Sequence, residues 1–441
     1  MGHPSQGAGP GDDEDGPGRA SDGATPGIGG FGPFPGGVPG LEGLAGAFPG
    51  LEGFPGFGPG GLDLTQLLGM LTTSGPVNWE IARQVARAVA TEEAVEHPLD
   101  PGAPAAFGEL ARAAQTHVAD VTGLAATLAT PVRVLHATEW ADLHLEALRP
   151  VLEDLARTLG DAFRAQLQAE LDTEGPTADP IAGVLPMLAP ALLGLQAGSM
   201  VGYLARHALG RYDLPLPTPD APSLTFVASH IDEFEQAWSL PRADLRFTLA
   251  VHEVVHAAIR SVPWARDRLV ALSREYVRGY HLDLHALEER FGALDPANPE
   301  SFEALASRPQ EILGAMRHPA QAAVQARLRD FTTVLEGYAD TVVAHVTERL
   351  VPAAAQIHEA FKRHRIDRGE AGHFIDALLG LDLGRDDYER GHRFCTGVVE
   401  RAGFEGLNRL WSTESMVPTT PELDAPGLWL ARIDLPEEHA P

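Results

Sequence analysis

The chain has almost no cysteine, since Cys395 is the one cysteine in 441 residues. A single thiol cannot form an internal disulfide framework, and it cannot build a metal site from several cysteine ligands. This usage fits a reducing compartment, so we expect a cytoplasmic protein. No basic segment followed by an apolar run opens the sequence, and no signal peptide is predicted.

Positive charge is also scarce. The 33 Lys and Arg residues stand against 61 Asp and Glu, which gives a formal net charge of −28. Nucleic acids and anionic membrane surfaces attract basic faces, so we expect neither as the main partner. The chain is long enough to bury a large core.

One stretch, residues 180–205, lacks charge altogether and is long enough to cross a bilayer. Pro186 and Pro190 interrupt it, and its flanks show no clear basic bias, so no membrane span is expected. Gly194, Gly198 and Gly202 recur every four residues. We predict a buried helix over about 190–209 that packs closely through these glycines.

The first 62 residues are dominated by Gly and Pro and carry an acidic run at 12–15. Such a segment buries too little apolar surface to offset its ordering entropy, so we predict a disordered tail over 1–62. Residues 63–441 are expected to form one mainly α domain with few short strands. Asn78 is a candidate N-cap, and residues 224–228 are the best candidate strand. That strand either binds an extended peptide beside the site or is purely structural.

The motif with the clearest chemistry is His252-Glu253-Val254-Val255-His256, an H-E-x-x-H pattern within an apolar helical stretch. Residues four apart share one face of a helix, so His252 and His256 can close on one ion. Glu253 beside them can take a proton from a metal-bound water. The pattern predicts a zinc site.

A catalytic zinc needs a third protein ligand. Ile259 and Val262 occupy the positions where the longer H-E-x-x-H-x-x-G-x-x-H motif needs Gly and His, so that class is excluded. Two glutamates remain as candidates. Glu275 follows His256 by nineteen residues, and Glu336 lies in a second helical stretch of about 321–350 with Asp340 one turn later. An acid at that position can orient a zinc-bound histidine, which favours Glu336.

The H-E-V-V-H segment and the later L-E-G-Y-A-D at 335–340 resemble the zincin-like metallopeptidase family. The resemblance extends over most of the chain, from the G-P-V-N-W-E at 75–80 through G-R-Y-D-L-P at 210–215 to G-L-N-R-L-W at 406–411. It implies a zincin-like fold with His252, His256 and Glu336 as Zn²⁺ ligands and Glu253 as the base. One branch of that family is named for coenzyme F420 biosynthesis.

We therefore predict a zinc metallohydrolase, specifically a peptidase acting on a peptide or protein substrate. Glu253 is the predicted general base, and Asp340 the predicted partner of a ligand histidine. The alternative is a zinc-binding scaffold or regulatory protein with weak or no catalysis, which recruits partners through its N-terminal tail. An open metal position and an adjacent cleft favour the enzyme, whereas a closed four-ligand site favours the scaffold.

Overall fold

The computed structural model describes residues 75–92, 96–126, 131–174, 180–281 and 318–435. The predicted tail over 1–62 lies outside these residues. The described elements in the first part of the chain are α3 (Trp79–Ala90), α4 (Ala103–Thr122), β1 (Arg133–Leu135), α5 (Ala137–Glu174), α6 (Pro180–Ala205), β2 (Thr225–Val227), α7 (Ala228–Ala237), α8 (Arg242–Arg260) and α9 (Pro263–Arg278).

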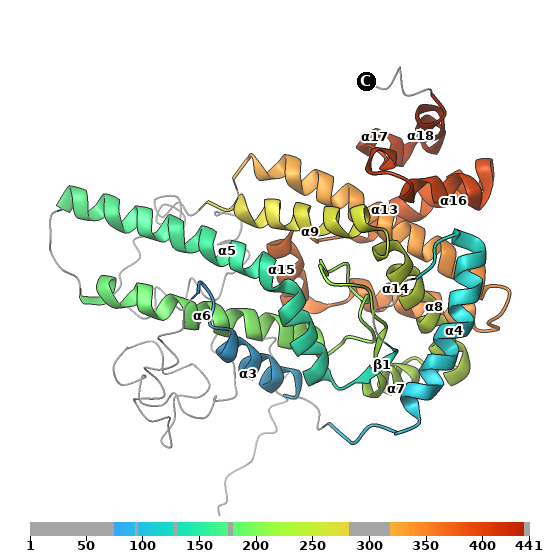
Figure 1. Cartoon of the computed structure of the whole chain (residues 1–441), viewed down its shortest axis with the longest axis horizontal. Helices are drawn as coiled ribbons and strands as arrows, with labels where there is room; N and C mark the ends of the chain where they lie inside the picture. Colours follow the sequence, from blue (N-terminus) through green and yellow to red (C-terminus); the bar gives the residue numbers. More distant parts are fainter. Residues whose placement is uncertain (1–74, 93–95, 127–130, 175–179, 282–317, 436–441) are drawn as a thin grey trace, which may run out of the picture.

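The second part contains α13 (Gln321–Thr347), α14 (Ala354–Ile366), α15 (Gly369–Leu379), α16 (Arg385–Asn408), two short 3₁₀ turns (Arg409–Trp411 and Glu414–Met416), α17 (Thr420–Asp424) and α18 (Pro426–Ile433). The predicted mainly α class is confirmed. Figure 1 shows α5, α6 and α3 on one side of the molecule, and α16 to α18 at the end that carries the C-terminus.

The helix ends follow from local chemistry. The side chain of Asn78 caps α3, because its Oδ1 accepts a hydrogen bond from the Ile81 amide at 3.1 Å. Pro263 stands in the first turn of α9, where a missing amide hydrogen costs nothing, and it separates α8 from α9. The predicted N-cap at Asn78 is thus confirmed.

Helix α6 packs through its glycines, as predicted. A Cβ atom on Gly194, Gly198 or Gly202 would lie 2.3, 2.4 or 2.6 Å from the carbonyl oxygens of Asn78, Ala82 and Ala86 respectively. The backbones of α3 and α6 therefore touch with no side chain between them. None of the described helices is both long and apolar enough to cross a membrane.

The bounds of α6 differ from the prediction at both ends. The helix begins at Pro180 and runs through Pro186 and Pro190. It ends at Ala205, four residues early, because the Leu209 amide, which would donate to the Ala205 carbonyl in a longer helix, donates to Asp213 Oδ2 at 3.2 Å instead. The carbonyls after the helix also bind other partners. Leu209 accepts from the Val227 amide, and Ala208 accepts from His230 Nδ1.

The predicted strand at 224–228 is confirmed as β2, which is buried and pairs in parallel with β1. On its other side, Phe226 forms an antiparallel bridge with Gly210. Both edges of β2 are thus engaged, which favours the structural alternative over a peptide-binding edge.

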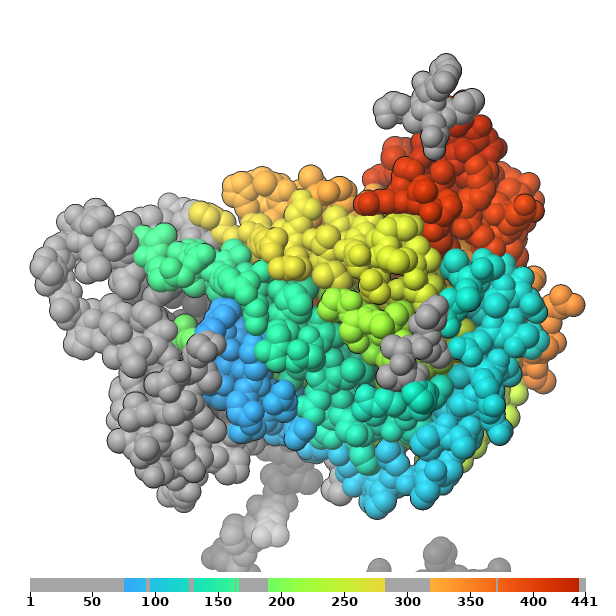
Figure 2. All heavy atoms as spheres, in the orientation of Figure 1, coloured from blue at the N-terminus to red at the C-terminus, as the bar shows by residue number. Residues whose placement is uncertain are grey.

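Helices α8 and α13 are the central elements of the fold. From Thr248 to Arg260 every residue of α8 is buried, and α13 is almost as deeply enclosed from Leu328 to Thr347. On the face shown in Figure 2, the surface is formed largely by α4, α5, α9 and the C-terminal helices. The polar residues within these buried stretches, Glu253 and Glu336 among them, are buried polar groups, which are more informative than buried apolar ones.

Candidate metal centre

The H-E-x-x-H motif lies in the last three turns of α8, as the pattern predicted. The imidazole rings of His252 and His256 lie side by side, with centroids 4.4 Å apart and ring planes tilted by 53°. Glu253 is fully buried, and the two histidines are 6% and 0% exposed. Burial, together with the charges of His252 and Arg260, lowers the pKa of His256 well below its usual value. His256 is therefore neutral, the state in which an imidazole binds a metal.

Glu336 lies on α13, which packs against α8. Glu336 is 1% exposed, and burial raises the pKa of its carboxyl against the opposing effects of Arg365 and His252. Glu275, the rival candidate, is exposed on α9 and forms an ion pair with Arg327. The structure thus brings Glu336, and not Glu275, into the buried surroundings of the histidines.

Glu253 is held by main-chain amides. Its Oε2 accepts a hydrogen bond from the Arg211 amide at 2.9 Å, and its Oε1 accepts one from the Tyr212 amide at 3.0 Å. Gly210 makes this approach possible, because a Cβ there would lie 2.5 Å from Glu253 Oε1. The remaining lone pairs of the carboxylate stay available for a proton. Oε1 also lies 3.6 Å from His252 Nδ1.

Asp340 lies one turn after Glu336, but its hydrogen bonds go to an arginine. Arg365 on α14 donates from Nη2 to both carboxylate oxygens of Asp340, at 2.8 and 2.9 Å. From Nη1 it donates to Glu336 Oε2 at 3.1 Å. Within the described residues no hydrogen bond joins Asp340 to His252 or His256. The predicted contact between Asp340 and a histidine stays a prediction, and Arg365 is a site residue that the sequence did not reveal.

A second arginine, Arg260, also lies at the centre and was not predicted from the sequence. It lies four residues after His256, a spacing that could have signalled contact. Its Nη1 lies 3.0 Å from His256 Nδ1, and its guanidinium sits over the Tyr212 ring at 4.6 Å. A guanidinium only donates, so Nδ1 accepts and the ring proton of neutral His256 is on Nε2. For a metal ion to bind at Nε2, that proton must move to Nδ1, and Arg260 must then withdraw from Nδ1, because both atoms would be donors.

Three buried atoms in this centre show whether the residues suit a metal ion. In the described chain, His252 Nδ1, His256 Nε2 and Glu336 Oε1 are buried and have no hydrogen-bond partner. Buried polar atoms without partners are rare, and nitrogen and carboxylate oxygen are zinc donors. The donor types therefore fit zinc. The donor atoms are not arranged around one point, however. Nowhere in the described ranges are three His, Cys, Asp or Glu side chains grouped so as to hold a metal ion.

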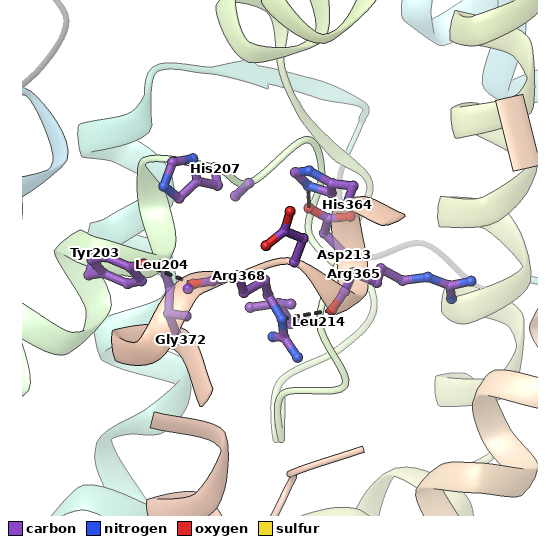
Figure 3. A pocket seen from close by; sticks show the side chains of 12 residues that line it. Tyr203, Leu204, His207, Asp213, Leu214, His364, Arg365, Arg368 and Gly372 are labelled. Atoms are coloured by element: carbon purple, nitrogen blue, oxygen red, sulfur yellow. Dashed lines mark hydrogen bonds and ion pairs between the residues drawn. The ribbon is translucent and has the colours of Figure 1, made fainter. Parts of the chain in front are cut away.

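A pocket of about 210 Å³ opens beside the centre, between the end of α6, the chain at 207–214 and the α14–α15 junction. Its lining includes Asp213 and His364, which form an ion pair at 3.1 Å, and it includes Arg365. Figure 3 shows the Arg365 side chain extending away from the pocket. Burial alone would raise the pKa of Asp213, but His364 and, more weakly, His252 lower it. The pocket and the histidine helix are thus neighbours.

Comparison with known proteins agrees with this architecture. A crystal structure from Chloroflexus aurantiacus, described as a "putative hydrolase with a novel fold", is similar over 82% of this chain and 99% of its own, with 25% identity and a TM-score of 0.56. Among curated proteins no match is found. A family model described as zincin-like metallopeptidase matches residues 77–430, most of the chain. The protein therefore belongs to the zincin-like metallopeptidase family.

Proposed function

We propose that this protein is a zinc-dependent hydrolase that cleaves peptide bonds, with His252, His256 and Glu336 as the metal ligands. The observation that carries the proposal is that each of these side chains, from two different helices, leaves one donor atom buried without a partner. Membership of the zincin-like family and the likeness to a protein described as a hydrolase support it.

Zinc, when bound, supplies a Lewis acid that polarises a carbonyl and lowers the pKa of a coordinated water. Glu253 accepts the proton of the attacking water at Oε1, the oxygen nearer to His252. The amides of Arg211 and Tyr212 hold the carboxylate in place while a proton is transferred. Glu253 then donates that proton to the leaving amine, in the role of general acid.

The pocket favours an enzyme over a zinc-binding scaffold, because a substrate needs a cavity. This one shares Arg365 with the centre, although its lining does not include His252, Glu253, His256 or Glu336. We propose that a side chain of the peptide or protein substrate enters it. One observation favours the alternative. Arg260 occupies His256 Nδ1 and adds a positive charge close to the site, as expected of a centre that binds metal weakly. A scaffold of that kind would recruit partners through the 1–62 segment.

The zinc content of the purified protein tests the ligand assignment. We expect about one zinc per chain in the unmodified protein, and loss of zinc in Glu336→Gln. Glu275→Gln is the matched control, since it makes the same chemical change on an exposed helix surface and should retain the metal. A parent protein that cannot be loaded with zinc would refute the proposal, as would a Glu336→Gln protein that holds zinc normally.

Glu253→Gln tests the base. The variant should keep zinc and lose roughly 10²- to 10⁴-fold in peptide hydrolysis, the usual contribution of a general base. Its amide oxygen can accept from only one of the two backbone amides, so we also expect unfolding to become about 1–3 kcal/mol easier. Peptide-library cleavage and thermal unfolding measured on one preparation separate the two effects. Full activity in the zinc-loaded variant would rule out Glu253 as the base.

A further inference from the structure

Among the described residues, Arg365 is the side chain that hydrogen-bonds to both Glu336 and Asp340 of α13. It is buried, comes from the last turn of α14, and donates to Glu336 Oε2 and to both oxygens of Asp340. Its guanidinium lies over the Tyr388 ring at 4.9 Å. Burial works against its charge, yet Asp340 and Glu336 raise the pKa of Arg365. It is therefore a permanent cation inside the centre.

This arrangement treats the two oxygens of Glu336 differently. Oε2 is hydrogen-bonded to Arg365 Nη1, while Oε1 is buried and, among the residues described, has no hydrogen-bond partner. A carboxylate held by one oxygen cannot rotate freely to present both. The free oxygen belongs to the residue assigned as the third metal ligand.

We propose that Arg365 is a positioning residue that fixes Glu336 so that Oε1 alone is offered to a metal ion. The inference rests on the proposed zinc function and adds how the third ligand is held. Asp340 serves as the anchor for the guanidinium, so its part in the site is to hold Arg365 in place.

The chemistry requires arginine at this position. A guanidinium is planar and has several donors in a rigid fork, so it can bridge two carboxylates on one helix face. A lysine ammonium is a single point of charge and cannot reproduce both contacts with the same geometry. Stacking on Tyr388 adds a further restraint on the plane of the group.

The test compares metal binding in the unmodified protein, Arg365→Met, Arg365→Lys and Arg329→Lys. Arg329 is the matched control. It lies on α13, the helix that carries Glu336, and forms two hydrogen bonds with Asp387, at 2.8 and 2.7 Å, without touching Glu336. The readouts are the zinc dissociation constant, from competition with a chromophoric chelator, and the visible spectrum of the cobalt(II)-loaded protein. Four-coordinate cobalt(II) absorbs visible light much more strongly than cobalt(II) with more ligands.

We expect Arg365→Met to weaken zinc binding by about 10-fold or more, as is usual when a group that orients a ligand is lost. The cobalt absorption per bound ion should fall, because a freed Glu336 can bind through both oxygens. Arg365→Lys should show the same changes to a smaller extent, and it carries the test if the methionine variant does not fold. Arg329→Lys should match the unmodified protein in both readouts.

Zinc affinity within about twofold of the parent, with an unchanged cobalt spectrum in both Arg365 variants, would overturn the inference and leave the proposed function standing. A parent protein that binds neither zinc nor cobalt would overturn both. Equal losses in Arg365→Lys and Arg329→Lys would show a general effect of helix docking, and would likewise refute a specific role for Arg365.

Discussion

The α3–α6 interface and the α8–α13 centre are both deeply buried, but they are built in opposite ways. Between α3 and α6, glycines bring two backbones into contact and leave no room for a methyl group. Between α8 and α13, buried histidines, carboxylates and arginines meet, and several of their polar atoms lack partners. The first arrangement maximises packing, whereas the second maintains polar atoms at a cost in stability. Such a cost is typical of a functional site.

The largest effect should come from adding one methyl group to the packed interface. In Gly198→Ala the new Cβ would lie 2.4 Å from the Ala82 carbonyl oxygen, so the helices must separate. We expect unfolding to become about 1–3 kcal/mol easier, measured by chemical denaturation, with zinc binding unchanged. Gly160→Ala is the control. It lies within α5 with nothing near its Cβ, and should stabilise by about 0.5–1 kcal/mol.

If Gly198→Ala weakened zinc binding as strongly as it weakened folding, the two regions would not be independent. The two regions would then form one cooperative unit, and the α3–α6 glycine contact would help to hold the metal centre in place.

A smaller effect is expected from Arg260→Met, which should strengthen zinc binding and leave folding almost unchanged. This change removes a positive charge from the centre and frees His256 Nδ1, so zinc should bind more tightly, on the order of 10-fold. Folding should change little, because Arg260 Nε and Nη2 are buried without hydrogen-bond partners in the described structure, and a poorly satisfied buried charge contributes little net stability. Chelator competition measures the first quantity and thermal unfolding the second. Weaker zinc binding in the variant would instead make Arg260 a support of His256.

The last effect is a change with pH. It concerns Asp376, which forms an ion pair with Arg368 of the pocket lining. Burial raises the pKa of Asp376 to about 7, against the opposing pull of Arg368. The folded-state pKa exceeds the unfolded value near 3.8, so the neutral carboxyl stabilises the fold at low pH. That contribution is lost as the pH rises toward and through 7. Denaturation between pH 5 and pH 8 should show a smaller decline in stability in Asp376→Asn than in the parent, and an identical pH profile would contradict the assignment.

Local patterns made part of this structure predictable. The Asn78 cap, the glycine spacing of α6 and the i, i+4 pairs of the centre all depend on residues within one or two helical turns. These features are encoded in short stretches. The cap and the glycine packing are confirmed, whereas the roles of the residues in the i, i+4 pairs stay predictions.

The supporting groups of the centre were not predictable, because they join distant parts of the chain. Arg365 lies 29 residues from Glu336, and the amides that hold Glu253 lie about 40 residues before it. Main-chain donors have no side-chain signature at all, and an arginine on a helix is usually exposed. Only the tertiary arrangement shows that these groups converge.

The grip of the Arg211 and Tyr212 amides on Glu253 has a consequence for hydrogen exchange. Both amide hydrogens are buried and bonded to one carboxylate, so their protection from solvent depends on where that carboxylate lies. Any event that draws Glu253 toward the histidines would loosen both bonds together. The exchange rates at these two positions would therefore report the movement of the proposed base, in the intact protein and without any substrate.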